Sequence, residues 1–484
     1  MSPNTSFPLH ESPQNTITQL ILDHPRVTFH VDRDVLVIAI KDELLVRKAS
    51  RIDSPRLNEA LLKVASNAGS LGRRPASGRG EDDADEESDT FEPPPEPSAA
   101  DEVEIWRLIN PDDNSIDQAR RLRILAQEEC CRTRSGPSSV VPPVSPNHVC
   151  VVSEFDCCPA TPPIPVPPIP TPPPFVEAPD DAPMASVVVI DTGYIETYPF
   201  NAALDARVTV VPGEWYDTAA SQWRTCPPDF VDTDPEGRLI GVVGHGTFIA
   251  GIVAHQSRQA QVTVVGQRYD CMPLTPNLVD KQRLFATEYD IASALLNHAD
   301  ADVVSCGFAF PTLDGYASIA FTSVMQVLTG PDAPRPGVAV VAPAGNERTT
   351  HPYWPAAHPD VVGVAATNPL GGARAWFSNW GPWVNCCARG QDVRSTFVDW
   401  VGPIQGEPLS DVYNFSGWAI WNGTSFSTPK VSGAIARAVA ENGITGVDAY
   451  ELLISGGGGV AVTPLTDMTL TPFPGVTLPH LHLD

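Results

Sequence analysis

Short hydrophobic runs alternate with stretches of helical periodicity over residues 185–455. The apolar runs, rich in Val and Ile, are Val187–Ile190, Val262–Val265, Val303–Ser305, Val338–Val341 and Val361–Ala365. Between them, Tyr289–His298 and Tyr316–Leu328 are predicted to be helical. Strands that are apolar throughout and separated by helices predict an α/β fold, with a mostly parallel sheet covered by helices on both faces. Such sheets bind ligands at the carboxyl ends of their strands.

Residues 1–158 show a smaller pattern of strands and helices. The predicted strands are Val27–Val31, Val35–Ile40, Val103–Ile109 and His148–Val152. Ser54 followed by Pro55 predicts the start of a helix, and Ser115–Glu128 predicts a second one. An acidic insert at residues 74–103 has the composition of a disordered linker. We therefore expect a small α+β N-terminal unit that is interrupted by this insert.

Prolines recur every two or three positions over residues 159–184. This density favours an extended polyproline II spacer and disfavours pairing in a sheet. A docking site for a proline-binding partner domain is the alternative interpretation. Residues 456–484 are rich in glycine and then mixed, so we expect a C-terminal tail there.

The chain has 484 residues and a formal net charge of −27. Such a charge repels nucleic acid and anionic membrane surfaces, so neither is an expected partner. No segment approaches the roughly 20 apolar residues of a membrane span. The first residues lack the basic and then apolar pattern of a secretory signal. The expected location is therefore the cytoplasm.

Ten cysteines are present, and six of them form adjacent pairs: Cys130 with Cys131, Cys157 with Cys158, and Cys386 with Cys387. Sequence neighbours rarely bridge each other, so we expect reduced thiols. The five cysteines between Cys130 and Cys158 lack the C-x-x-C spacing of a zinc site. Cys386 and Cys387 lie in an apolar stretch and are expected in the core.

Three segments carry candidate chemistry. Asp191 directly follows a predicted strand, and His245 lies between Gly244 and Gly246, which let backbone and substrate approach it. Ser425 stands where a loop turns into a helix with free N–H groups. Taken singly, each has an ordinary explanation: a turn residue, a structural histidine or a helix N-cap.

Together the three segments resemble the signatures of the subtilisin-like (subtilase) serine peptidases, in that family's chain order of Asp, His, Ser. The segments Val341–Glu347, Tyr353–Ala356 and Phe377–Pro382 resemble the family as well. The likeness covers about residues 185–451 and implies a doubly wound sheet. An α/β-hydrolase is disfavoured because Ser427 occupies the second glycine position of its G-x-S-x-G motif.

The resemblance implies a role for each matched residue. Ser425 would be the nucleophile, His245 its base, and Asp191 the group that orients the imidazole. Asn346 would hold the oxyanion together with the backbone N–H of Ser425, and Thr424 would supply an auxiliary hydroxyl there.

Substrate contacts also follow from the resemblance. Ser305, Cys306 and Gly307 match the family's edge strand, which pairs with an extended protein or peptide substrate. Phe308 and Tyr353 stand where relatives keep small residues, which predicts a narrowed pocket beside the scissile bond. No cofactor is needed. Subtilases often bind structural calcium, but no acidic loop here matches a known calcium site, so we assign no metal ligands.

The sequence thus predicts a serine endopeptidase. The alternative is a catalytically silent, protease-like scaffold or adaptor that acts through its N-terminal and proline-rich segments. A further expectation is that the N-terminal unit acts as an intramolecular inhibitor, because subtilases commonly carry a small α+β prosegment.

Overall fold

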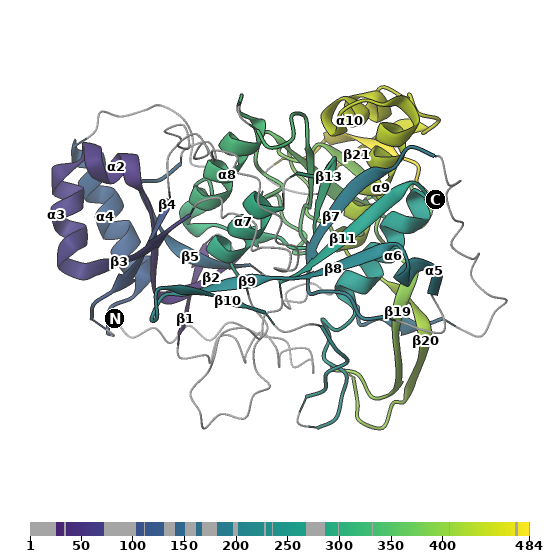
Figure 1. Ribbon diagram of the computed structural model, residues 1–484, viewed down its shortest axis with the longest axis horizontal. Helices are drawn as coiled ribbons and strands as arrows, with labels where there is room; N and C mark the ends of the chain where they lie inside the picture. The colour runs from purple at the N-terminus through teal and green to yellow at the C-terminus, as the bar shows by residue number, and fades with distance from the viewer. Residues whose placement is uncertain are drawn as a thin grey trace, which may run out of the picture.

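The computed structural model places a small N-terminal unit (residues 26–150) beside a larger main unit (residues 182–483) (Figure 1). The described residues are 26–32, 35–71, 103–110, 112–129, 141–150, 161–166, 182–196, 202–226, 229–234, 236–267, 286–298, 300–331, 333–405, 407–469 and 473–483.

A nine-stranded sheet forms the centre of the main unit. Its strands, in spatial order, are β21 (Val462–Asp467), β22 (Val476–Leu481), β18 (Cys386–Arg389), β17 (Val361–Thr367), β15 (Ala339–Pro343), β13 (Val303–Cys306), β7 (Ala185–Asp191), β11 (Ala260–Gly266) and β8 (Val208–Pro212). Every neighbouring pair is parallel except β21 with β22. After β7 the chain forms β8 and β11 on one side of it and then β13, β15, β17 and β18 on the other, so a topological switch point lies between β7 and β13, as in other doubly wound sheets. The predicted α/β class is confirmed for this unit.

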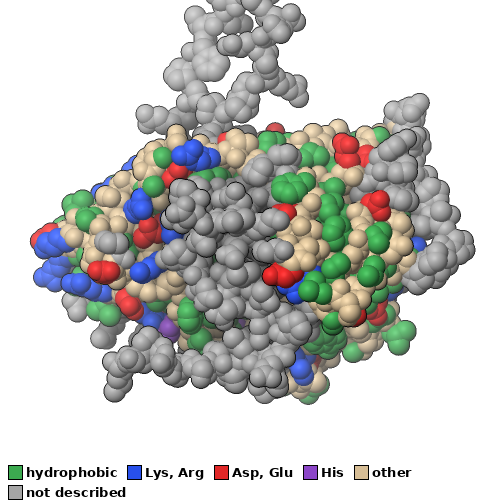
Figure 2. Space-filling view, turned by 90° about the horizontal axis from the view of Figure 1, so that it is seen from below, with side chains coloured by type: hydrophobic (Ala, Val, Ile, Leu, Met, Phe, Trp, Pro, Cys, Tyr) green, Lys and Arg blue, Asp and Glu red, His purple; other side chains and the backbone are tan. Residues whose placement is uncertain are grey.

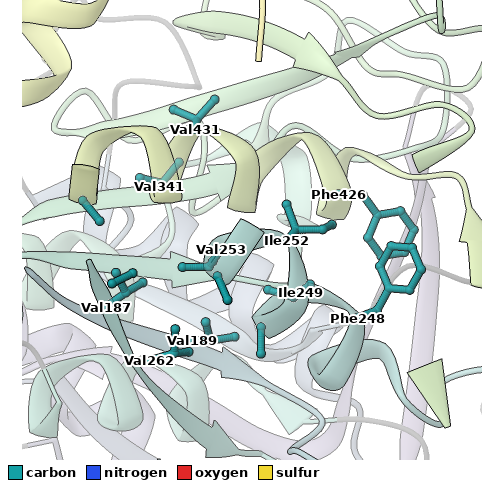
Figure 3. Packing of buried hydrophobic residues seen from close by; sticks show 14 of the residues in the cluster. Val187, Val189, Phe248, Ile249, Ile252, Val253, Val262, Val341, Phe426 and Val431 are labelled. Atoms are coloured by element: carbon teal, nitrogen blue, oxygen red, sulfur yellow. The ribbon is translucent and has the colours of Figure 1, made fainter. Parts of the chain in front are cut away.

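Helices cover both faces of this sheet. On one face lie α6 (His245–Gln256) and α9 (Thr424–Asn442); on the other lie α7 (Glu288–Asn297) and α8 (Ile319–Thr329). Figure 3 shows the valines of β7 and β11 packing under α6, and the Phe248 and Phe426 rings in tilted contact with each other near the starts of α6 and α9. Residues 245–254 of α6 are all buried, because α9 and β19 cover the sides of the helix that the sheet leaves free. A further helix, α10 (Gly446–Ile454), packs against α9.

A long hairpin, β19 (Val393–Gly402) and β20 (Tyr413–Trp421), extends from the main unit. A third strand, β6 (Ile164–Pro165), pairs antiparallel with β20. The proline-rich region was expected to avoid sheet pairing, and this expectation is wrong for these two residues. The pairing works because β6 lies at the edge of the sheet, where a proline without an N–H is tolerated. Shorter pairs are β9 (Glu214–Asp217) with β10 (Gln222–Thr225), and β14 (Phe310–Pro311) with β16 (Tyr353–Trp354).

The N-terminal unit is an antiparallel sheet with helices on one face. Its strands are β1 (Val27–Asp32), β2 (Val35–Arg47), β3 (Ala65–Ser70), β4 (Val103–Leu108) and β5 (Val144–Cys150), and its helices are α2 (Lys48–Asp53), α3 (Pro55–Val64) and α4 (Ser115–Glu129). Ser54 caps α3 as expected, since its hydroxyl accepts the N–H of Leu57 at 3.2 Å. The strand expected over His148–Val152 instead begins at Val144, and residues 151 and 152 lie outside the described residues.

The two units share a sheet. Strand β12 (Ala286–Thr287) belongs to the main unit, immediately before α7, and pairs antiparallel with β5 of the N-terminal unit. In Figure 1 the N-terminal sheet faces α7 and α8. One hydrophobic cluster runs across this interface, from Ile38 and Val149 on one side to Tyr289 and Phe321 on the other. The units are therefore joined by both backbone pairing and a common core.

Two expectations from the sequence differ from the structure. Residues 456–484, expected to form a tail, contribute β21 and β22 to the main sheet. Cys226, expected to be a reduced thiol, is disulfide-bonded, whereas the described Cys150, Cys306, Cys386 and Cys387 are free. Cys386 and Cys387 are fully buried, so their placement in the core is confirmed.

The face shown in Figure 2 carries Lys and Arg side chains over the N-terminal unit and many hydrophobic side chains over the main unit. In the part of the chain that the structure describes, no helix combines the length and the apolar character needed to cross a membrane.

Candidate active site

Asp191 and His245 form a buried pair at the rim of the main sheet. Asp191 is the last residue of β7, and His245 is the first residue of α6. The imidazole Nδ1 lies 2.9 Å from each carboxylate oxygen of Asp191. Both side chains are almost inaccessible to solvent, at 0% and 1% exposure. The carboxylate therefore fixes the ring orientation and leaves Nε2 as the nitrogen that can exchange a proton with a reacting group.

Glycines make this close approach possible. Gly244 precedes α6 with φ of 78°, a left-handed conformation that glycine adopts without strain. A β-carbon on Gly246 would overlap the carbonyl oxygen of Gly193. The glycines on either side of His245 therefore allow the close backbone approach that the sequence predicted.

Ser425 lies in the first turn of α9, where the helix leaves the N–H of Ser425 without an intrahelical acceptor. Its side chain is 2% exposed. The partial positive charge of the helix start favours a developing oxyanion at this point. The His245 ring packs against both Trp421 and Phe426, with centroid distances of 5.6 and 5.3 Å. Residues on both sides of Ser425 in the sequence therefore contact the imidazole.

Asn346 and Thr424 are locked together beside Ser425. The Asn346 Oδ1 accepts both the backbone N–H and the hydroxyl of Thr424, each at 2.9 Å. The same hydroxyl accepts the Gly345 N–H at 3.1 Å. Because its carbonyl oxygen is engaged, Asn346 has its NH₂ group left to donate. Thr424 is fully buried, so its hydroxyl orients Asn346 rather than facing a ligand itself.

Ser305, Cys306 and Gly307 follow one another at the carboxyl end of β13. The expectation of an edge strand is wrong, because β13 lies between β7 and β15. The Ser305 hydroxyl accepts that of Ser432 at 3.0 Å, and the Gly307 N–H donates to the Ile190 carbonyl at 3.1 Å. The Ser305 hydroxyl and the Gly307 N–H are thus both engaged within the protein. Phe308, which follows Gly307, is buried, and its ring packs on Phe321 of α8.

Taken together, the structure brings Asp191 next to His245, and Asn346 and Thr424 next to the start of α9. Burial raises the pKa of the Cys306 thiol, so it stays protonated at neutral pH and does not serve as a nucleophile. Among the described residues, no group of three or more His, Cys, Asp or Glu side chains is arranged to hold a metal ion.

The model of the Subtilase family matches residues 184–455, more than half of the chain. The chain belongs to the subtilase family. Curated relatives include the Thermophilic serine proteinase of Bacillus sp. (strain AK1), 28% identical over 54% of this chain and 53% of that protein. Another is Thermitase of Thermoactinomyces vulgaris, 27% identical over 54% of this chain and 76% of that protein. The chain spans about half the length of the first of these relatives.

Among solved structures, fervidolysin from Fervidobacterium pennivorans, a keratinolytic enzyme related to subtilisin, matches with a TM-score of 0.48 and 18% identity. The match covers 86% of this chain and 57% of that one.

In this subtilase, sequence reasoning assigned no role to Thr192 or to Trp421 and Asn422. The Thr192 N–H and hydroxyl both donate to Asp191 Oδ1, at 2.7 and 3.2 Å, so Thr192 holds the carboxylate in place. Its position directly after Asp191 was the sequence feature that could have indicated this role. Trp421 Nε1 donates to the Thr161 carbonyl at 2.7 Å, and Asn422 Nδ2 donates to the Thr161 hydroxyl at 2.5 Å. No local pattern links Thr161 to residues 260 positions away.

Proposed function

We propose that this protein is a serine endopeptidase that hydrolyses peptide bonds in proteins or peptides. Ser425 Oγ attacks the scissile carbonyl carbon while His245 Nε2 takes the hydroxyl proton. The tetrahedral oxyanion accepts hydrogen bonds from the Ser425 N–H and the Asn346 amide. Collapse of this intermediate breaks the C–N bond, and His245 returns the proton to the leaving amine. Water then hydrolyses the acyl-enzyme by the same proton transfers.

The observation that carries this proposal is the pair of 2.9 Å contacts from His245 Nδ1 to the Asp191 carboxylate. A histidine held in this way keeps its proton on Nδ1, so the lone pair of a base is on Nε2. The two hydrogen bonds from Thr424 to Asn346 also support the proposal, because they orient the Asn346 amide as a donor for the oxyanion.

A fluorophosphonate probe tests this proposal directly, since it forms a covalent bond to an activated serine and releases fluoride. We expect one label per chain, mapped to Ser425 by peptide mass spectrometry, together with hydrolysis of a quenched peptide. The Ser425→Ala protein should take no label, whereas Ser410→Ala, at an exposed serine, should label normally. A folded protein that takes no label and cleaves no peptide would favour the silent scaffold instead.

We also propose that the N-terminal unit restrains this activity while it stays attached. Its strand β5 pairs with β12 beside α7. The His148 Nε2 accepts the Leu313 N–H at 3.0 Å, so Nδ1 carries the proton that it donates to Glu288 at 2.5 Å. Both side chains are buried at the interface.

The docked linker supports the same proposal. Thr161 is bonded to Trp421 and Asn422, which immediately precede the turn into α9 and Ser425. A substrate that extends past the scissile bond would have to share this region with the linker.

Charge reversal at the interface tests the restraint in the full chain. Arg120 of α4 binds Asp314 of the main unit through Nε, 3.2 and 3.1 Å from the two carboxylate oxygens. We expect Arg120→Glu to raise the hydrolysis rate of a small peptide, and the double variant with Asp314→Lys to bring it back toward the starting value. Lys63→Glu is the matched control, because Lys63 pairs with Glu59 on the exposed face of α3. Equal rates in all four folded proteins would contradict the restraint.

A further inference from the structure

We infer that Tyr353 closes the pocket beside the scissile bond, so that this protein cuts after small residues such as glycine, alanine and serine. The inference deepens the proposed endopeptidase function and rests on it. It concerns the substrate residue whose carbonyl is attacked by Ser425.

The position of this pocket follows from the sheet. Strands β13 and β15 are parallel neighbours, and their carboxyl ends lie on the same edge as Asp191. The chain leaves β13 at Gly307 and leaves β15 through Gly345 to Asn346. A carbonyl whose oxygen reaches Asn346 therefore carries its side chain into the crevice between these two strand ends.

On the β15 side, side chains packed around Gly345 already fill the crevice. Its φ of +96° requires glycine, and a β-carbon there would stand 2.8 Å from Glu347 Oε2 and 3.0 Å from Tyr353 Cδ1. The tyrosine ring thus lies directly against the backbone that precedes Asn346. It is 3% exposed.

The Glu347 carboxylate, which lies beside Gly345, is surrounded by polar groups of the protein. It accepts a hydrogen bond from Asn379 Nδ2 at 2.9 Å. Burial raises the pKa of Glu347, while the Asn379 amide and the neighbouring Tyr353 hydroxyl and Asn346 N–H act against the rise. The carboxylate is therefore occupied within the protein and is not presented to a basic substrate side chain.

The Tyr353 backbone is also fixed. Residues Tyr353 and Trp354 form β16, which pairs with β14, placing Tyr353 opposite Pro311. A large substrate side chain would have to displace a buried ring whose backbone is fixed by this pairing.

The test is a series of quenched peptides that differ only in the residue before the scissile bond: Ala, Leu, Phe or Arg. For the full-length protein we expect kcat/KM to be about 100-fold or more higher with Ala than with Phe, the scale that a steric pocket provides. Tyr353→Ala should narrow this ratio by at least about 10-fold, mainly by raising kcat/KM for the Phe peptide. Tyr353→Phe keeps the ring and should keep the selectivity. Tyr413→Ala, at an aromatic residue on β20 outside the crevice, is the matched control.

Each outcome decides the inference. The unmodified protein alone tests it if Tyr353→Ala fails to fold. Cleavage after Phe or Leu as fast as after Ala would overturn it, and a preference for Arg would overturn it by making Glu347 a direct substrate partner. Neither result would affect the proposed function, because both include hydrolysis and labelling at Ser425. Absence of hydrolysis and labelling together would overturn the proposed function and this inference with it.

Discussion

Gly307 lies against Asp191 so closely that a β-carbon on Gly307 would overlap Oδ2 of the carboxylate and stand 2.7 Å from its Cγ. Asp191 has no room to retreat, because it is fully buried and bonded to Thr192 and His245. The end of the central strand β13 thus forms a wall of the Asp191 site.

We predict that Gly307→Ala lowers kcat by about 100-fold or more, since moving the aspartate disturbs the tautomer and orientation of His245. Steady-state kinetics, together with circular dichroism to confirm folding, would measure this. Gly372→Ala is the control: Gly372 is exposed, and a β-carbon there would meet nothing within 4 Å. If both variants keep normal activity, Gly307 does not constrain the aspartate.

Asn346→Leu should lower kcat by about 100- to 1,000-fold with KM little changed, the size of effect known for the oxyanion asparagine of subtilisin. Leucine keeps the volume of the side chain but cannot donate to the oxyanion. It also cannot accept from Thr424, so Thr424→Val should reproduce part of the loss, whereas Thr424→Ser, which keeps the hydroxyl, should reproduce less. An effect seen only in KM would point to a role in substrate binding.

Asp290 should make stability depend on pH. Burial raises the pKa of this carboxyl from 3.8 to about 7, against hydrogen bonds from Thr287 and the Tyr216 N–H. The folded protein therefore keeps a proton that the unfolded chain loses above about pH 4. The resulting stabilisation is complete below that pH and is lost as the pH rises through about 7.

Urea titrations of the Ser425→Ala protein, chosen to prevent self-digestion, would measure this effect. Between pH 5 and 8 its free energy of unfolding should fall by roughly 2 kcal/mol relative to the same protein carrying Asp290→Asn, which cannot titrate. Parallel pH profiles for the two proteins would contradict the prediction.

Thr161→Ala should weaken the docking of the linker beside Ser425 by removing the hydrogen bond from Asn422. For peptides that extend well past the scissile bond, we expect KM to fall by about 2- to 10-fold, the equivalent of one hydrogen bond. Peptides that end at a chromophore directly after that bond should show no change. An equal fall in KM for both classes of peptide would contradict the prediction, because the effect would then arise elsewhere in the site.

The parallel strands could be predicted because they are buried on both faces, and continuous runs such as Val187–Ile190 follow from that burial. The C-terminal hairpin was missed because β21 and β22 are only half covered and contain Pro464 and Pro479. Strand β5 was misplaced for a different reason. Its Pro146 and Asn147 have the local character of a turn, and Asn147 is buried only because Glu43 and Tyr289 bond to it.

The candidate site divides in the same way. Asp191, His245, Asn346 and Ser425 each lie in a short motif, so their positions could be found without a structure. The use of the Thr424 hydroxyl to orient Asn346 could not, because it depends on a contact between residues 78 positions apart. The filling of the crevice by Tyr353 was indicated by a departure from small residues, whereas the position of its ring against the Gly345 backbone needed the coordinates.

The pairing of His148 with Glu288 joins residues 140 positions apart, so this part of the interface cannot form until both residues have been synthesised. At a synthesis rate of about 5–20 residues per second, a ribosome needs on the order of 10 to 30 seconds to make the chain between them. Throughout that interval, β5 has no β12 to pair with, and His148 has no Glu288 carboxylate to accept its hydrogen bond. The N-terminal unit is thus made with an open strand edge, and it becomes complete only when α7 has been synthesised.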